Sequence, residues 1–141
     1  MNSAELARAL ADVSAVTVTA LLPDLSVDEE TTRRHVRFLL KAGVRVIVPA
    51  GNTGEFYALT REENERVIRM TMQEAKGKAL VVAGVGYTFQ DSAHLARAAQ
   101  DAGADAIMIH QPICPYVHPD GLARYYLAIA EAVSIGVVLY G

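Results

Sequence analysis

The segment Val44-Arg45-Val46-Ile47-Val48-Pro49-Ala50-Gly51-Asn52-Thr53-Gly54-Glu55 decides the fold of this chain. Its first seven residues are mostly apolar and rich in β-branched side chains, which predicts a buried β-strand. The glycine-flanked residues 51–55 predict a turn that leaves the carboxyl end of that strand, because glycine allows close backbone approach and positive φ. Parallel α/β folds bind small anionic ligands at this end of the sheet.

Four residues of this turn, Gly51, Asn52, Thr53 and Gly54, form the candidate binding site. Thr53 offers a hydroxyl, and successive backbone N–H groups in such a turn can converge on a carboxylate. Glu55 is expected to be structural, accepting hydrogen bonds from N–H groups of the loop. We therefore predict a site for a small carboxylate at the end of this strand.

The rest of the chain alternates between strand patterns and helix patterns. Strands are expected at residues 15–21, 44–50, 79–84, 104–110 and 136–140. Helices are expected from Ser26 or Asp28 to about residue 42, and at residues 60–76, 90–102 and 119–132. Strand starts recur about every 30 residues, which is the period of a βα unit. No linker or low-complexity tract interrupts this pattern, so residues 1–141 are expected to form one α/β domain.

The overall composition excludes several classes of protein. The chain has 141 residues, is 52% hydrophobic and carries a net charge of −3, so it lacks the basic footprint of a nucleic-acid-binding protein. No apolar run is long enough to span a bilayer, and the N-terminus does not resemble a signal peptide. The single cysteine, Cys114, suits a reducing compartment. We expect a cytoplasmic protein that contacts neither membrane nor nucleic acid.

Five strands and four helices are too few to close an eight-stranded barrel, which typically needs about 250 residues. The N-terminal portion of a TIM (β/α)8 barrel is the most economical interpretation once the family resemblance described below is taken into account. A complete five-stranded doubly wound domain of the flavodoxin type is the structural alternative, because its length is comparable. In a partial barrel the first and last strands would have open edges, so the isolated chain is expected to be either poorly soluble or self-associated through these edges. The side chains expected to face the barrel interior are those of Val16, Val18, Val46, Val48, Val82 and Ile107.

Four landmarks in order along the chain resemble the dihydrodipicolinate synthase and N-acetylneuraminate lyase family. They are the turn at 51–55, the third strand with its glycine turn at 79–86, the opening of the fourth helix at 119–122, and the fifth strand at 137–140. The resemblance extends from about Val16 to the last residue. It implies a homo-oligomeric lyase, without cofactor or metal, that acts on a 2-oxo acid such as pyruvate or a sugar acid through a lysine Schiff base.

The resemblance also implies roles for individual residues. Tyr140 would be the catalytic residue that relays protons to and from the substrate, and a phenol can both donate and accept a hydrogen bond. The alternative for Tyr140 is an ordinary aromatic residue packed at a strand end. Thr53 would contact the substrate carboxylate and complete the relay. Asn52 departs from the hydroxyl residue common in the synthases, and Phe56-Tyr57 looks closer to sugar-acid dehydratase and aldolase relatives.

The Schiff-base lysine of the family lies on the sixth strand, which this chain does not include. Lys41, Lys76 and Lys78 are expected at helix ends and in the adjoining turn, on the opposite side of the sheet from the candidate site. We therefore expect the 141-residue chain alone to be inactive. The alternative is a non-catalytic α/β module or truncated pseudo-enzyme that binds a small carboxylate or a partner.

Two further motifs suggest other ligands. His110, Cys114 and His118 are residue types that bind zinc, but two prolines constrain the loop and a fourth ligand is not evident, so no metal is expected. His110 and Gln111 are instead expected at the barrel mouth, where they would affect substrate specificity. The Gly84-Val85-Gly86 segment lacks the third glycine and the acidic residue of a dinucleotide site, which favours a tight turn.

Overall fold

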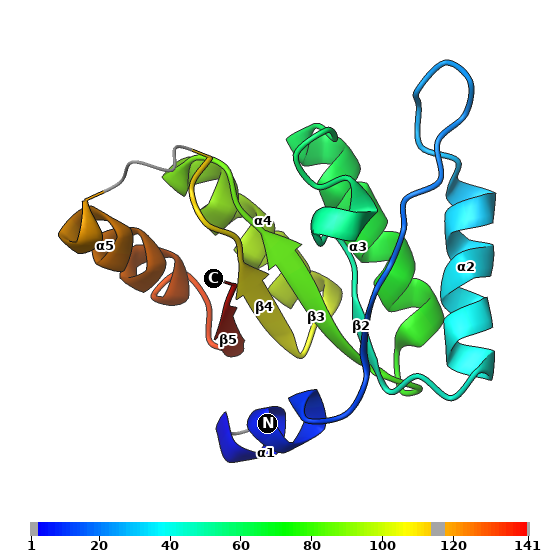
Figure 1. Cartoon of the computed structure of the whole chain (residues 1–141), viewed down its shortest axis with the longest axis horizontal. Coiled ribbons are helices and arrows are strands. Elements are labelled where there is room, and N and C mark those ends of the chain that lie inside the picture. Colours follow the sequence, from blue (N-terminus) through cyan, green and yellow to red (C-terminus); the bar gives the residue numbers. More distant parts are fainter. Residues whose placement is uncertain (1–2, 114–117, 141) are drawn as a thin grey trace.

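The computed structural model describes residues 3–113 and 118–140 and has an α/β fold. Five parallel strands form one sheet in the order β1-β2-β3-β4-β5. The strands are β1 (Ser14–Val16), β2 (Val46–Val48), β3 (Leu80–Val85), β4 (Ala106–Ile109) and β5 (Gly136–Leu139). The helices are α1 (Ser3–Leu10), α2 (Glu29–Lys41), α3 (Arg61–Ala75), α4 (Phe89–Ala102) and α5 (Pro119–Ala130) (Figure 1).

The strand order excludes the doubly wound alternative. A doubly wound sheet reverses its strand order at a switch point and carries helices on both faces. Here each strand pairs with the next one in the sequence, and α2 to α5 form one layer in which successive helices contact each other. The arrangement is that of the N-terminal part of a TIM barrel, as predicted.

Alternating side chains give the sheet two different faces. The face toward the helix layer contributes Ile47, Val81, Ala83, Ile107 and other buried residues to one cluster that also contains side chains from α2, α3, α4 and α5. The opposite face contributes Val46, Val48, Val82 and Ala106 to a second cluster that is completed by Leu6 of α1. The core therefore lies on both sides of the sheet.

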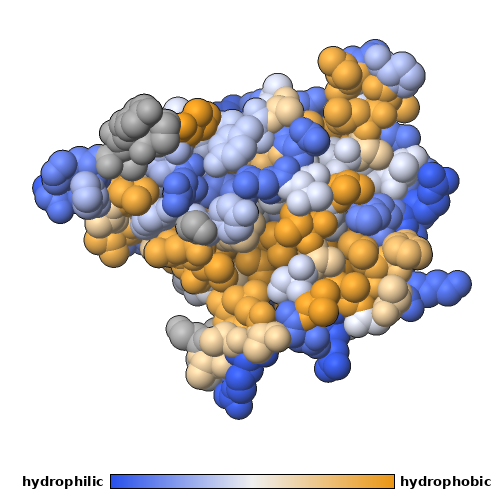
Figure 2. All heavy atoms as spheres, viewed as in Figure 1, coloured by the Kyte–Doolittle hydropathy of each residue, from blue (hydrophilic) through white to orange (hydrophobic). Residues whose placement is uncertain are grey.

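The N-terminal helix α1 was not predicted, and it changes the expected exposure of the inner face. Its Leu6 covers this face, so Val46, Val48 and Val82 are buried despite the small number of strands. The prediction that Ile107 faces the barrel interior was wrong, because the alternation in β4 places Ile107 in the cluster on the helix side. Figure 2 shows hydrophobic side chains among the strands on the face drawn and at the tip of the loop between β1 and α2.

Helix ends follow the capping signals of the sequence. Asp28 is the N-cap of α2, and its carboxylate accepts a hydrogen bond of 3.0 Å from the N–H of Thr31. Thr60 and Glu63 form a reciprocal capping box at the start of α3. Ser26, the other predicted cap, instead bonds to Asp24.

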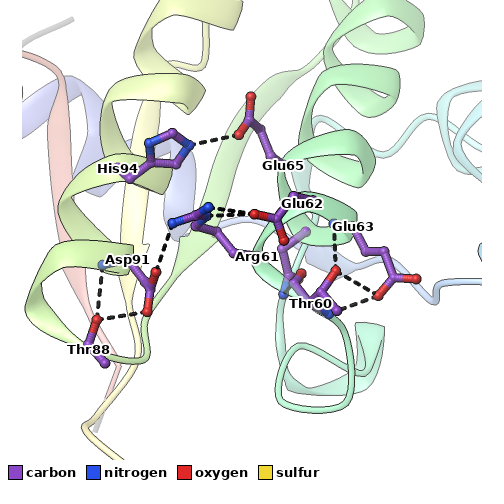
Figure 3. A network of polar contacts seen from close by, with 9 residues as sticks. Thr60, Arg61, Glu62, Glu63, Glu65, Thr88, Asp91 and His94 are labelled. Atoms are coloured by element: carbon purple, nitrogen blue, oxygen red, sulfur yellow. Dashed lines mark hydrogen bonds and ion pairs between the residues drawn. The ribbon is translucent and has the colours of Figure 1, made fainter.

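A polar network links the N-termini of α3 and α4 (Figure 3). Arg61 of α3 contacts Glu62 and reaches Asp91 of α4 at 3.3 Å, and the Nε2 of His94 lies 2.9 Å from Glu65. These exposed ion pairs contribute little to stability individually. They nevertheless connect the two helices whose N-termini flank the carboxyl ends of β2 and β3.

Candidate functional site

The predicted carboxylate-binding turn lies at the carboxyl end of β2. Residues 52–54 form a single turn of 3-10 helix, η1 (Asn52–Gly54), in which the N–H of Gly54 donates to the carbonyl of Gly51 at 2.9 Å. Asn52 and Thr53 are exposed, whereas Gly51 and Gly54 are buried. The turn therefore presents an amide and a hydroxyl side chain to solvent, while the two glycines pack against the rest of the protein. We call residues 50–55 the cradle.

Steric crowding explains the two glycines of the cradle. A Cβ at Gly51 would lie 2.5 Å from Cγ1 of Val16, and a Cβ at Gly54 would lie 2.8 Å from the carbonyl oxygen of Thr17. Gly51 itself has a φ of −87°, so the predicted use of glycine for positive φ was wrong at this position. The left-handed residues are those that flank the turn, Ala50 and Glu55, with φ of 55° and 62°.

Neighbouring segments hold both ends of the cradle. The hydroxyl of Thr19 donates to the carbonyl of Gly54 at 2.8 Å in a buried position. Beyond the cradle, the fully buried Phe56 is fixed through its carbonyl, which accepts from the amide of Asn64 at 3.0 Å and from the hydroxyl of Tyr87. The expected hydrogen bonds from loop N–H groups to Glu55 are absent among the described residues, where this side chain is exposed.

Tyr140 follows β5 at the same end of the sheet as the cradle. Its N–H donates to the carbonyl of Ile109 at 3.1 Å, and its side chain is 45% exposed. The alternative of a tyrosine packed beneath a helix does not fit this exposure. Because all five strands are parallel, their carboxyl ends lie at the same end of the sheet. The cradle after β2 and Tyr140 after β5 therefore lie at one end of the sheet, as predicted.

His110 connects these two parts of the site. Its ring centroid lies 4.4 Å from that of Phe56 in a stacked arrangement and 5.7 Å from that of Tyr140 in an edge-on one. Its Nε2 lies 3.0 Å from the carbonyl oxygen of Ala50. His110 directly follows β4 at the carboxyl end of the sheet, where it was expected, but its side chain is fully buried, so a direct part in substrate specificity does not fit. Burial also lowers the pKa of His110.

Tyr57 extends the aromatic group toward solvent. Its hydroxyl donates to the carbonyl of Gln111 at 3.1 Å, and burial raises the pKa of the phenol. Asn52, Glu55, Tyr57 and Ala58 line a hollow of about 360 Å³ beside the cradle. Sequence reasoning noted Phe56-Tyr57 but did not identify the cluster of Phe56, Tyr57, Tyr87 and His110, because its members come from three separate loops.

The lysines lie at the other end of the sheet, as expected. Lys76 and Lys78 border a cleft of about 570 Å³ that also includes Arg8, Arg45 and Asp105. Lys41 ends α2 at the same amino end of the strands. This cleft is larger than the hollow beside the cradle, but it contains none of the predicted site residues.

The other ligand motifs have simple outcomes. Cys114 lies outside the described residues, and within residues 3–113 and 118–140 no group of three His, Cys, Asp or Glu side chains could hold a metal ion. Gly84 and Gly86 lie against Ala50, Phe56 and His110, so this glycine pair serves packing around the cradle. Among the described helices, none is long and apolar enough to cross a membrane.

Comparison with protein families gives a match over most of the chain. The model described as the dihydrodipicolinate synthetase family matches residues 9–141. A 4-hydroxy-tetrahydrodipicolinate synthase from Chloroherpeton thalassium is 41% identical over 134 residues, which cover 94% of this chain and 44% of that protein. A probable 5-dehydro-4-deoxyglucarate dehydratase from Streptomyces avermitilis is 38% identical over 143 residues, which cover 99% of this chain and 46% of that protein.

Solved structures give the same result. Dihydrodipicolinate synthase from Oceanobacillus iheyensis superposes with a TM-score of 0.94 at 38% identity, covering 99% of this chain and 47% of that one. A prophage protein of the dihydrodipicolinic acid synthase family from E. coli K12, solved in complex with pyruvate, has a TM-score of 0.85 at 30% identity. That match covers 91% of this chain and 44% of the E. coli protein. The chain thus spans less than half the length of each of these relatives.

Proposed function

The chain belongs to the dihydrodipicolinate synthetase family, and from this premise we propose that it supplies the carboxylate-binding and proton-transfer groups of a lyase acting on a 2-oxo acid. The observation that carries the proposal is the position of the cradle and Tyr140 at one end of the sheet. The pyruvate complex of the E. coli relative supports a small 2-oxo acid as the ligand class.

In the proposed site the cradle holds the substrate carboxylate. The Thr53 hydroxyl and the backbone N–H groups of Asn52 and Thr53 donate to its oxygens, and the exposed side-chain amide of Asn52 adds a further donor. Fixing the carboxylate orients the adjacent C2 carbonyl. Tyr140, at the same end of the sheet, then moves protons to and from the groups attached to C2.

The covalent step requires a neutral lysine amine, which attacks C2 and releases water to form an imine. All three lysines of this chain, Lys41, Lys76 and Lys78, belong to helix ends or turns at the amino end of the strands. The reactive lysine of the proposed site must therefore come from outside these 141 residues. By itself the chain would bind the carboxylate without forming the imine.

Two features favour a sugar-acid substrate over the synthase reaction. Asn52 replaces a hydroxyl residue with an amide, which can bind a carboxylate but is a poor proton relay. Phe56-Tyr57 places an aromatic side chain beside the hollow next to the cradle. The dehydratase from Streptomyces avermitilis is nearly as similar to this chain as the synthases are. A cytoplasmic location and a homo-oligomeric assembly remain predictions.

Titration of the ¹⁵N-labelled chain with pyruvate tests the carboxylate site. We expect shifts of the Thr53 and Gly54 amide signals, and much smaller shifts with methyl pyruvate, which has lost the negative charge. Thr53→Ala should weaken binding about tenfold, the value of one charge-assisted hydrogen bond. Ser134→Ala removes a hydroxyl from the amino end of β5 and is the matched control. Equal responses to pyruvate and its ester would contradict the proposal.

The rival function is a non-catalytic module that binds a carboxylate. Within the described residues no lysine lies at the carboxyl end of the strands, where the cradle is, and this favours the rival for the isolated chain. The two functions differ in what a lysine-bearing second half would add. We expect borohydride trapping of pyruvate when such a half, taken from a relative, is joined to this chain. Binding without trapping in the joined protein would support the rival.

A further inference from the structure

We propose that His110 is a positioning residue, which donates a hydrogen bond from Nε2–H to the carbonyl of Ala50 and thereby sets the conformation of the cradle. The consequence for ligand binding rests on the function proposed above, whereas the effect on the cradle itself does not. Nothing in the sequence pattern of the cradle requires a histidine 60 residues away in the chain.

Ala50 is the point at which the cradle backbone departs from the sheet. The N–H of Thr17 donates to the carbonyl of Val48, and the N–H of Gly84 donates to that of Pro49, which ends the pairing of β2 with its neighbours. Ala50 then adopts a φ of 55°, a conformation that residues with a side chain rarely adopt. Among the described residues, the partner of its carbonyl is His110, at 3.0 Å.

The glycine pair in β3 and the following turn makes room for this contact. β3 lies between β2 and β4, so a bond from His110 to Ala50 must cross it. A Cβ at Gly84 would lie 1.9 Å from the oxygen of Ala50 and 2.9 Å from Nε2 of His110. A Cβ at Gly86 would lie 2.8 Å from Phe56 and 3.1 Å from Cβ of His110. The Gly84-Val85-Gly86 motif thus leaves the space in which His110 contacts Ala50.

Aromatic contacts with Phe56, Tyr57 and Tyr140 fix the imidazole at the position required for this bond. Phe56, which follows the cradle directly, stacks on the ring at 4.4 Å, and Tyr140 packs against it edge-on at 5.7 Å. One side chain therefore contacts the start of the cradle, the residue after it, and the proposed proton-transfer tyrosine. A shift of His110 would change the relative position of the carboxylate-binding and proton-transfer groups.

The bond also determines the tautomer of His110. A carbonyl oxygen can only accept, so Nε2 must carry the proton. Nδ1 is buried and has no partner within the described residues, and an imidazolium there would be an isolated buried charge. The lowered pKa that burial causes agrees with a neutral ring. His110 therefore acts as a neutral donor of fixed orientation.

Hydrogen exchange of the ligand-free 141-residue chain tests the positioning role. Amides at residues 51–55 should exchange about tenfold faster in His110→Leu, which removes the donor, while those of α3 should change much less. His110→Gln retains an N–H donor at the ε position and should restore most of the protection. His94→Leu is the matched control, because His94 is an exposed histidine paired with Glu65 on the outer helices.

Pyruvate affinity gives a second readout, in which His110→Leu should bind about tenfold more weakly and His110→Gln close to wild type. Unchanged exchange at residues 51–55 in His110→Leu would overturn the inference. Equally faster exchange at residues 51–55 in His110→Leu and His110→Gln would also overturn it, because the packing of the imidazole, and not its hydrogen bond, would then hold the cradle. If wild type fails to bind pyruvate, the proposed function fails, but the exchange result still decides the role of His110.

The wild-type chain alone provides a test if the variants do not fold. Long-range ¹H–¹⁵N spectra of the imidazole at pH 7.5 should show a proton on Nε2 and none on Nδ1. Observation of the Nδ1–H tautomer, or of a doubly protonated ring, would overturn the inference. His94 and His35 serve as internal references, since their imidazole signals are recorded in the same sample.

Discussion

At the residue scale, the site depends on a few positions where backbone geometry and side-chain chemistry meet. Ala50 and Glu55 carry the left-handed conformations, while Gly51 and Gly54 are required by their close neighbours Val16 and Thr17. Sequence reasoning located the cradle but assigned the positive φ to the glycines. The glycines are explained by crowding from β1 and the segment after it, and that contact exists only in the folded molecule.

The lysine positions lead to a prediction about covalent chemistry. We expect pyruvate and borohydride to leave the 141-residue chain unmodified, because Lys41, Lys76 and Lys78 lie away from the cradle. All three are exposed to solvent, whereas a lysine that forms an imine must be held against the substrate carbonyl. Intact-mass analysis checks this, and a relative with its own Schiff-base lysine is the positive control. A stoichiometric adduct on one of the three lysines would show that the assignment of the cradle end is wrong.

The burial of His110 predicts how stability depends on pH. The pKa of His110 in the folded state is lowered from an unfolded value of about 6.5. Below pH ~6.5, His110 therefore binds more protons in the unfolded chain than in the folded one. The contribution of His110 is therefore complete above pH ~6.5 and is lost as pH falls toward the folded pKa, with a slope of at most about 1.4 kcal/mol per pH unit. Urea unfolding between pH 8 and pH 5 measures this slope.

The matched variant for this measurement is His110→Gln, which does not titrate. We expect its free energy of unfolding to decline less than that of wild type between pH 6.5 and pH 5. The exposed histidines and the carboxylates are common to both proteins and cancel in the comparison. Parallel curves for the two proteins would show that His110 is already charged in the fold or remains accessible to protons.

At the element scale, capping residues were predicted more accurately than strand lengths. Asp28 and Thr60 begin α2 and α3 as expected, because their side chains satisfy local N–H groups. The first strand was expected at residues 15–21 but ends at Val16. The following Thr17 and Thr19 are buried and pack against the cradle. The β-branched residues after Val16 therefore form a loop and do not extend the strand.

Strand β3 provides an element-scale prediction. Gly84→Ala should destabilise the fold by about 3 kcal/mol or more, because the new Cβ would overlap the carbonyl oxygen of Ala50, which is backbone and cannot rotate away. Gly121→Ala in α5 is the control, since no atom lies within 4 Å of its Cβ position. Gly121 lies in the first turn of α5, where replacing glycine by alanine should be neutral or stabilising by up to about 1 kcal/mol. Urea midpoints give both values.

An equal effect of the two substitutions would contradict the packing described around Ala50. Hydrogen exchange adds a local readout to the Gly84→Ala experiment. Amides of residues 51–55 should lose protection before those of α2, because the clash lies beneath the cradle. Loss of protection confined to α4 and α5 would place the strain elsewhere.

At the scale of the whole molecule, the order of the elements was predictable and the contacts between distant loops were not. A βα repeat, with glycine closely following α2, α3 and α4, and four family landmarks in order predicted the fold class. The burial of His110 depends on Gly84 in β3, on Gly86 in the turn after it, and on Phe56 after β2. Each of these residues looks ordinary in its own segment, so only the three-dimensional arrangement reveals their relation.

The open edges of the sheet give the last prediction. Within the described residues, β1 and β5 each pair on one side, so their other edges present free N–H and C=O groups. The Leu139 side chain on β5 is 58% exposed, and Val13 and Val16 are exposed at the other edge. Burying one such aliphatic side chain contributes about 1.5 to 3 kcal/mol. We therefore expect the isolated chain to self-associate through these edges, although α1 already covers part of the inner face.

Sedimentation velocity of the purified chain measures this association, and two lysine substitutions locate it. Leu139→Lys places a charge on the edge strand and should shift the chain toward monomer, since charged side chains block edge pairing. Leu25→Lys, at a loop tip where the side chain is 74% exposed, adds the same charge away from both edges and should leave the distribution unchanged. A wild-type monomer that unfolds cooperatively and binds no hydrophobic dye would show that the five-stranded sheet is stable with its edges open, and that neither edge is an association surface.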